Sequence, residues 1–149
     1  MQIKLKMLSL IMAFGLSSLA SAADISGLWQ SIDDKTGAPK GLVELKMDTQ
    51  GVYTGTIKKI TPRMGYTPKE FCVNCPAPYT GKPMIGLKAI TGLKHINGMD
   101  YGEGKILDPN TGKIYSLKAR LSNNGKRLQL RGYIGISALG RSQTWIRVE

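Results

Sequence analysis

The sequence has few of the residue types that build metal centres and catalytic sites. Its 149 residues include one histidine, two cysteines and ten acidic residues, against 21 lysines and arginines. One histidine and two cysteines do not supply the four nitrogen and sulfur ligands of a zinc site. His95 stands in the turn-like sequence KHING, and no serine or acidic motif accompanies it to form a catalytic triad. We therefore expect no catalytic residues, no metal, no cofactor and no enzymatic activity.

Long apolar runs are also scarce, and the only one lies at 7–19. It follows two lysines and precedes Ala-Ser-Ala at 20–22, which is typical of a secretory signal peptide and its cleavage site. The run is short for a membrane span, and no cysteine follows the cleavage site to carry a lipid anchor. The sequence predicts a signal peptide over 1–22 and one domain over 23–149. The product would be periplasmic or secreted, with no transmembrane segment after cleavage.

The shortage of acidic residues leaves the domain strongly basic. Without Lys4 and Lys6 of the signal peptide, 19 of the 21 basic residues remain, against 10 acidic ones. Such a charge favours anionic partners, such as phospholipid head groups, acidic glycans or an anionic small ligand. The basic residues are scattered through alternating segments, which indicates a solvated surface more than a dedicated patch. Nucleic acid is not an expected partner of an exported protein.

Amphipathic runs of helical period are lacking as well, and short segments of alternating polarity take their place. Sequences such as DDKTG, HING, DPNTG and SNNG separate them and suit tight hairpins. An irregular, proline-rich segment is expected over 61–83. The pattern predicts an all-β fold, an up-and-down antiparallel barrel of about eight strands with no exposed edge. The expected strands are 25–32, 40–48, 52–60, 87–93, 101–107, 113–121, 126–133 and 141–148.

Three stretches resemble a bacterial exported family known as a domain of unknown function. They are GLWQSIDDKTGAPKGLVEL (27–45), GKILDPNTGKIYSLKARL (104–121) and LRGYIGISALGRSQTWIRV (130–148). The resemblance covers nearly the whole predicted domain. It implies a lipocalin-like, or calycin, β-barrel and assigns no activity.

The pair Gly27-x-Trp29 resembles the glycine-x-tryptophan signature of lipocalins. In that superfamily the indole plugs the closed end of the barrel, and a basic residue of the last strand covers it. Arg141 and Arg147 flank Trp145 in the last predicted strand, so either could provide a cation–π cover. The resemblance thus predicts a barrel closed at the Trp29 end and open at the other.

The two cysteines, Cys72 and Cys75, stand in FCVNCPAPYTGKP. A redox dithiol would sit at a helix N-terminus, but prolines follow at once at positions 76 and 78. A zinc site lacks ligands, and an oxidising compartment favours a disulfide. We predict a structural disulfide on a loop away from the barrel core, with a small effect on stability because the ring is short. A thiol oxidoreductase is the less favoured alternative.

Alternation also predicts which side chains face the barrel interior. The expected inner-face residues are Val43, Leu45, Ile57, Leu117, Leu128 and Leu130, and Gly104 and Gly132 are expected to leave room for a ligand. The glycine-containing segment 134–140 is expected to bend between the last two strands and to pack Ile134, Ile136 and Leu139 at the mouth or base of the barrel.

An eight-stranded barrel has an interior that side chains fill or that holds one small ligand. The first hypothesis is a non-enzymatic binding protein for a small hydrophobic or amphipathic anionic ligand such as a fatty acid. The alternative is a structural or interaction protein of the cell envelope, with a filled barrel whose basic exterior binds anionic lipid or polymer.

Overall fold

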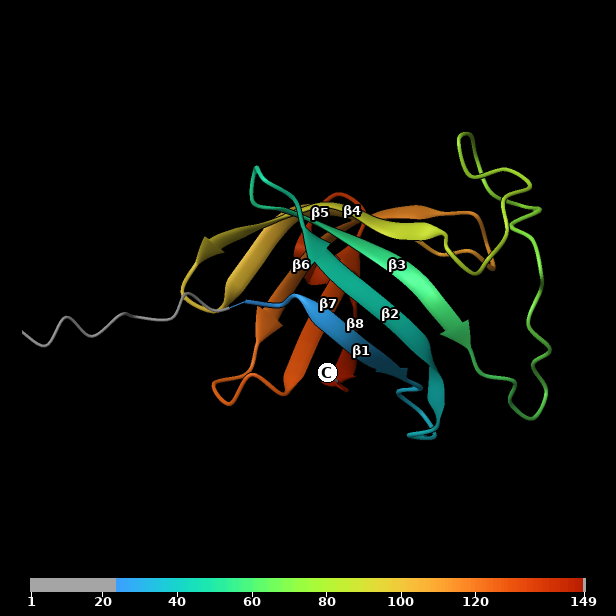
Figure 1. Ribbon diagram of the computed structural model, residues 1–149, viewed down its shortest axis with the longest axis horizontal. Coiled ribbons are helices and arrows are strands. Elements are labelled where there is room, and N and C mark those ends of the chain that lie inside the picture. Colours follow the sequence, from blue (N-terminus) through green and yellow to red (C-terminus); the bar gives the residue numbers. More distant parts are fainter. Residues whose placement is uncertain (1–23, 149) are drawn as a thin grey trace, which may run out of the picture.

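The computed structural model describes residues 24–148 and shows one closed antiparallel barrel (Figure 1). Each strand pairs with the next along the chain, and the first pairs with the last, so the fold is all-β as predicted. The predicted signal peptide, 1–22, lies outside the described residues. The elements are β1 (Gly27–Ile32), β2 (Pro39–Met47), β3 (Val52–Ile60), β4 (Lys88–Asn97), β5 (Asp100–Leu107), β6 (Ile114–Leu121), β7 (Arg127–Tyr133), η1 (Ser137–Leu139) and β8 (Arg141–Arg147).

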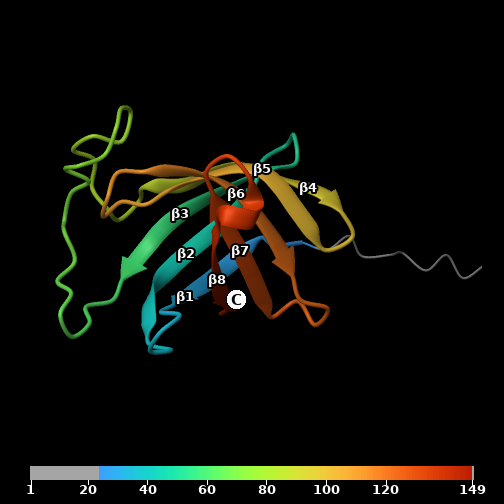
Figure 2. The ribbon, with the colours of Figure 1, turned by 180° about the vertical axis from the view of Figure 1, so that it is seen from behind.

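The barrel has two different ends. Three short hairpin turns, β2–β3, β4–β5 and β6–β7, gather at one end together with the segment that enters β1. The other end, called the mouth below, carries the remaining four connections. The longest of these is the β3–β4 connection, residues 61–87, which we call the arm. It leaves the barrel at the end of β3 and returns to β4 after a wide excursion (Figures 1 and 2).

Two strand boundaries differ from the prediction by two residues or more: β1 begins at Gly27 instead of Ile25, and β4 ends four residues later than expected. β4 continues to Asn97, where a turn was expected over His95–Gly98, because the hairpin turns later, at Gly98 and Met99. His95 is therefore a strand residue that pairs with Tyr101, and its Nε2 lies 2.8 Å from the carbonyl oxygen of Gly98. The irregular connection runs to 87, four residues beyond the expected end.

The apolar residues form two clusters. The larger fills the barrel from the closed end and consists of Ile25, Trp29, Val43, Leu45, Tyr53, Ile90, Leu93, Tyr101, Leu117, Ala119, Leu121, Leu128, Leu130 and Trp145. The smaller joins the arm to the mouth ends of three strands and consists of Ile57, Cys72, Cys75, Met84, Leu87, Ala89 and Leu107. Within residues 24–148 there is no helix long and apolar enough to cross a bilayer.

Candidate ligand-binding site

Trp29 closes the end of the barrel opposite the mouth. Its side chain is completely buried, and its indole N–H donates a 2.9 Å hydrogen bond to the carbonyl oxygen of Ile25. The guanidinium carbon of Arg147 lies 4.4 Å from the centre of the indole, within the range of a cation–π interaction. Of the two arginines considered from the sequence, Arg147 covers the tryptophan, and Arg141 lies at the mouth.

Arg147 also ties the closed end together through backbone carbonyl groups. It donates hydrogen bonds of 2.8, 2.7 and 2.8 Å to the oxygens of Gly125, Ser26 and Asp24. These acceptors belong to the β6–β7 turn and to the segment that enters β1. The arginine thus fixes two chain segments and the plug at once, and burial of its planar head is balanced by hydrogen bonds.

A buried hydroxyl and a carboxylate complete the closed end. The hydroxyl of Tyr53 donates a 2.9 Å hydrogen bond to Asp24. Burial, and then this bond to a carboxylate, raise the pKa of Tyr53. Burial alone would raise the pKa of Asp24 as well. The hydrogen bonds from Ser26 and Tyr53 and the charge of Arg147 outweigh it, so the pKa of Asp24 is lowered.

A cavity of about 400 Å³ occupies the mouth half of the barrel. Residues of all eight strands line it, so it lies within the barrel and not on its outer surface. Its walls are mostly apolar. The apolar lining residues are Val43, Ile57, Ile60, Ala89, Ile90, Ile106, Leu107, Leu117, Leu130 and Trp145. The barrel is therefore packed at its closed end and hollow at its mouth.

Basic side chains dominate the charge of the cavity lining. Lys40, Lys59, Arg63 and Arg141, the rim cations, stand against one acidic residue, Asp108. Arg141 lies 3.7 Å from Asp34, at an exposed position where the pair contributes little. Within residues 24–148, Lys59 and Arg63 have no carboxylate within 4.0 Å. An anion at the rim would thus meet cations that no ion pair neutralises.

Strand β8 connects both ends of this arrangement through every second residue. Arg141 and Gln143 line the cavity near the mouth, Trp145 lines it deeper, and Arg147 covers the plug. Side chains at alternate strand positions face the same side of a sheet. One strand face therefore supplies a rim cation, part of the cavity wall and the cover of the closed end.

These features agree with the comparisons to known proteins. Residues 27–147 match the family described as "Uncharacterized protein conserved in bacteria (DUF2147)". The chain belongs to this family. No curated protein matches it. Among solved structures, protein HP1028 of Helicobacter pylori, described as belonging to the lipocalin family, has a similar fold, with a TM-score of 0.70 and 19% identity over 85% of this chain and 84% of that chain. The predicted family and its lipocalin-like barrel are confirmed.

Alternation gave the inner face of this DUF2147 barrel, but not the depth of each residue within it. Val43, Ile57, Leu117 and Leu130 line the cavity. Leu45 and Leu128 do not, because they lie in the packed core nearer the closed end. Gly132 lines the cavity as expected. Gly104 instead packs against Leu93, which lies about 3.0 Å from the place of an added Cβ, so it provides no room for a ligand.

From the sequence, Arg141 was considered only as a cover for Trp29, and the other three rim cations were not singled out. The sequence did contain a signal for Lys59: it stands two residues after the inward-facing Ile57, and alternate residues of a strand face the same side. Arg63 had none, because it lies in the irregular arm. Its guanidinium carbon lies 4.6 Å from the ring centre of Tyr66, whose hydroxyl donates a 3.0 Å hydrogen bond to Asn110. The arm and the β5–β6 turn thus form one side of the mouth.

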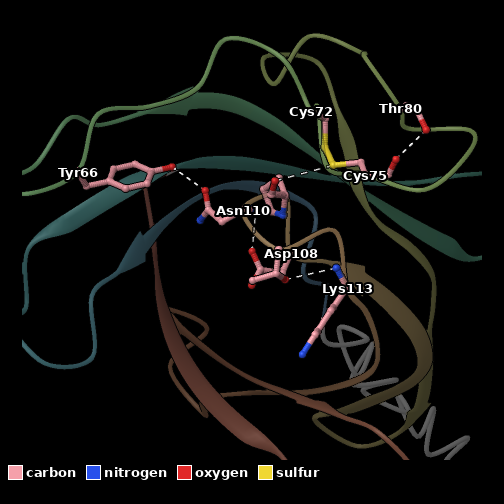
Figure 3. Close-up of a disulfide and its surroundings, with 9 residues drawn as sticks. Tyr66, Cys72, Cys75, Thr80, Asp108, Asn110 and Lys113 are labelled. Carbon is pink, nitrogen blue, oxygen red and sulfur yellow. Dashed lines mark hydrogen bonds between the residues drawn. A yellow bond between two sulfur atoms is a disulfide. The ribbon is translucent and has the colours of Figure 1, made fainter.

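The arm of the DUF2147 barrel contains the predicted disulfide between Cys72 and Cys75, which is confirmed (Figure 3). Thr80 donates a 2.7 Å hydrogen bond to the carbonyl oxygen of Cys75, and the Cys75 sulfur lies 3.8 Å from the carbonyl oxygen of Pro109. The arm passes close to Gly112, which has φ +75°, and the carbonyl oxygen of Asn74 takes the place that a Cβ would need. The disulfide loop is therefore seated directly on the β5–β6 turn.

The cysteines lie outside the larger cluster that fills the barrel, as expected, but the sequence did not indicate that they would be buried in a second apolar cluster. Cys72 is fully buried and Cys75 is 5% exposed, and both belong to the smaller apolar cluster. They pack there because the arm folds back over the ends of β3, β4 and β5. Catalytic dithiols need an accessible sulfur, and this burial favours a structural pair.

The expected packing of the β7–β8 connection is wrong. Ile134, Ile136 and Leu139 are all exposed, at 65%, 62% and 78%. The connection turns outward because Arg131, on the outer face of β7, bonds to the carbonyl oxygens of Ser137 and Ala138. Lys118 donates a further 3.0 Å hydrogen bond to the hydroxyl of Ser137. Polar anchors thus hold η1 against the outside of the barrel.

Proposed function

We propose that this chain is an exported, non-enzymatic binding protein for a small amphipathic anion. The apolar part of the ligand lies inside the barrel, and its anionic head lies among the rim cations. The observation that carries the proposal is the cavity of about 400 Å³, which has apolar walls and four basic residues in its lining. This volume is near the lower end of the range for small-molecule sites, and it suits a ligand with one acyl chain.

The two parts of the cavity contribute in different ways. Each methylene transferred from water to the apolar wall contributes about 0.8 kcal/mol, or about fourfold in affinity. Lys59 and Arg63 are at the mouth and partly in water, so they contribute less energy and determine the charge and orientation of the ligand. The plug formed by Trp29 and Arg147 closes the opposite end, so the ligand enters and leaves at the mouth.

Isothermal titration of a series of straight-chain carboxylates, each compared with the alcohol of the same length, tests this proposal. We expect the carboxylates to bind more tightly than the alcohols. Affinity should increase about fourfold per methylene until the chain fills the cavity, and then level off. Equal binding of carboxylate and alcohol would contradict the assignment of the rim cations.

Charge reversal separates the rim from the overall charge of the protein. The double variant Lys40→Glu/Lys59→Glu should weaken carboxylate binding about three- to tenfold, as for partly solvated charges, and leave alcohol binding unchanged. Lys126→Glu is the matched control because it is exposed in the β6–β7 turn, at the closed end. If Lys126→Glu weakens binding as much as Lys40→Glu or Lys59→Glu made alone, the rim has no specific role.

Blocking the cavity tests its apolar part. A Cβ at Gly132 would lie 3.5 Å from its nearest neighbour, an ordinary contact distance, so a larger side chain can enter the cavity with little strain. Gly132→Leu should abolish binding of both carboxylates and alcohols and leave the barrel folded. Undiminished binding in this variant would place the ligand elsewhere.

A further inference from the structure

The arm displays large apolar side chains on its outer side. Cys72 and Met84 point into the smaller cluster and are buried, but Phe71, Val73 and Ile85 beside them are 45%, 59% and 55% exposed. The arm therefore packs some side chains on the barrel and leaves large apolar side chains beside them about half exposed.

Backbone pairing holds this part of the arm in shape. Cys72 N–H donates to Lys82, Gly81 N–H to Cys72, and Met84 N–H to Glu70, with distances of 2.8 to 3.0 Å. Phe71 and Pro83 face each other in an isolated antiparallel bridge. The disulfide and the cluster beneath fix the same two segments. The exposed apolar side chains thus project from a segment whose backbone is held in place.

A second apolar contact lies beside the mouth. Arg63 and Tyr66 exchange two backbone hydrogen bonds across a tight turn, whose tip is Met64 and Gly65. Gly65 has φ +75°, which suits glycine, and Met64 is fully exposed. Because Arg63 and Tyr66 line the cavity, whatever surface Met64 contacts lies next to the entrance.

The arm and its flanking strand ends are strongly basic. Between positions 58 and 88 the chain has six basic residues and one acidic residue, Glu70. Lys69 and Lys82 stand on either side of the Phe71–Pro83 bridge and are exposed. We call the side chains of Phe71, Val73 and Ile85, together with Lys69 and Lys82, the docking face; Met64 lies on the same arm, beside the mouth.

We propose that the docking face binds the surface of an anionic lipid bilayer and brings the mouth to that surface. Exposed apolar side chains with two exposed lysines beside them match the two layers of such a surface, the acyl boundary and the anionic head groups. Two copies of the same cationic face repel each other, which disfavours self-association. A soluble polyanion would use the lysines and leave the apolar side chains in water.

This inference goes beyond ligand binding in the cavity and does not depend on it, because the docking face lies outside the barrel. Docking is measured with vesicles, and cavity binding with a carboxylate in lipid-free solution. The variants of the docking face should bind the carboxylate like the original protein. One proposal can therefore fail while the other holds, and the two experiments tell these outcomes apart.

Flotation with vesicles of phosphatidylcholine, with and without phosphatidylglycerol, tests the docking face. The protein should bind only vesicles that contain phosphatidylglycerol, and less as salt is raised. Phe71→Ser/Ile85→Ser and, separately, Lys69→Glu/Lys82→Glu should each weaken binding on the order of tenfold. Ile134→Ser/Leu139→Ser removes apolar side chains that are at least as exposed, on the β7–β8 connection, and should change nothing.

Phe71→Trp supplies a direct signal for insertion. Lipids brominated in their acyl chains should quench its fluorescence, whereas a tryptophan at Leu139 should not be quenched. Three results would overturn the proposal. The first is a loss of vesicle binding in Ile134→Ser/Leu139→Ser as large as in Phe71→Ser/Ile85→Ser. The second is self-association, without vesicle binding, that Phe71→Ser/Ile85→Ser abolishes. The third is binding to soluble polyphosphate in place of vesicles.

Discussion

Replacing Trp29 by alanine should remove about 4–6 kcal/mol from the free energy of unfolding. Loss of a fully buried tryptophan costs about 3–5 kcal/mol. The carbonyl oxygen of Ile25 also loses its partner, the indole N–H at 2.9 Å, which costs about 1 kcal/mol. Because a domain of this kind has only about 5–15 kcal/mol of stability, Trp29→Ala can leave the barrel close to unfolding.

A milder pair of substitutions isolates the contact between Arg147 and the indole. Trp29→Leu, Arg147→Met and the double variant form a cycle in which the other losses of each side chain cancel. The coupling energy should be about 0.5–2 kcal/mol, as for other cation–π pairs. Urea unfolding followed by far-ultraviolet circular dichroism gives all four stabilities.

Two results would refute the reasoning about the closed end. A loss below about 1 kcal/mol in Trp29→Ala would be typical of a surface position and not of a plug. A coupling energy near zero would mean that Arg147 acts only through its bonds to the backbone carbonyl groups.

Other parts of the barrel allow three further predictions. Because the pKa of Tyr53 is raised above 10.0 in the folded state, its contribution to stability is complete below pH about 10 and is lost as pH rises toward the folded pKa. Above pH 10 the urea midpoint of the original protein should therefore fall more steeply than that of Tyr53→Phe, and parallel curves would contradict this. Replacing Cys72 and Cys75 by alanine should lower the global stability only slightly and should speed hydrogen exchange within the arm; unchanged exchange there would show that the disulfide does not brace it. Gly112→Ala should destabilise the fold more than Gly125→Ala, because both glycines have positive φ but only Gly112 has a carbonyl group in the place of the new Cβ. Equal decreases of the melting temperature in the two variants would contradict this contact.

The strands could be predicted because alternation and turn residues are local properties of the sequence. Five of the eight strand pairs, β1–β2, β2–β3, β4–β5, β5–β6 and β6–β7, need no more than a polar turn between two alternating segments. The end of β4 was misplaced because both His95–Gly98 and Gly98–Met99 offer turn residues, and only pairing with β5 decides between them. Closure by β1 and β8 was expected because an open sheet of eight strands would leave exposed edges and because of the resemblance to lipocalins, not because of any local signal in those two strands.

The site was predicted only in part because alternation assigns a side chain to a face and not to a depth. Leu117 and Leu128 have the same pattern in sequence, but the first lines the cavity and the second is in the packed core. Arg63 reaches the rim through the arm, whose path depends on tertiary contacts such as those of the buried disulfide. No periodicity exists in such a segment, so its residues could not be placed from the sequence.

Titration of a methyl-labelled sample with a straight-chain carboxylate, followed by nuclear magnetic resonance, tests the central claim most directly. Leu117 and Leu130 line the cavity, and Leu45 and Leu128 are equally buried leucines that do not. We predict large, saturable shifts of the first pair, smaller shifts of the second pair, and no such difference when the Gly132→Leu variant is titrated. Saturation with equal shifts in both pairs, or shifts confined to the outer surface, would contradict binding in the cavity at the mouth.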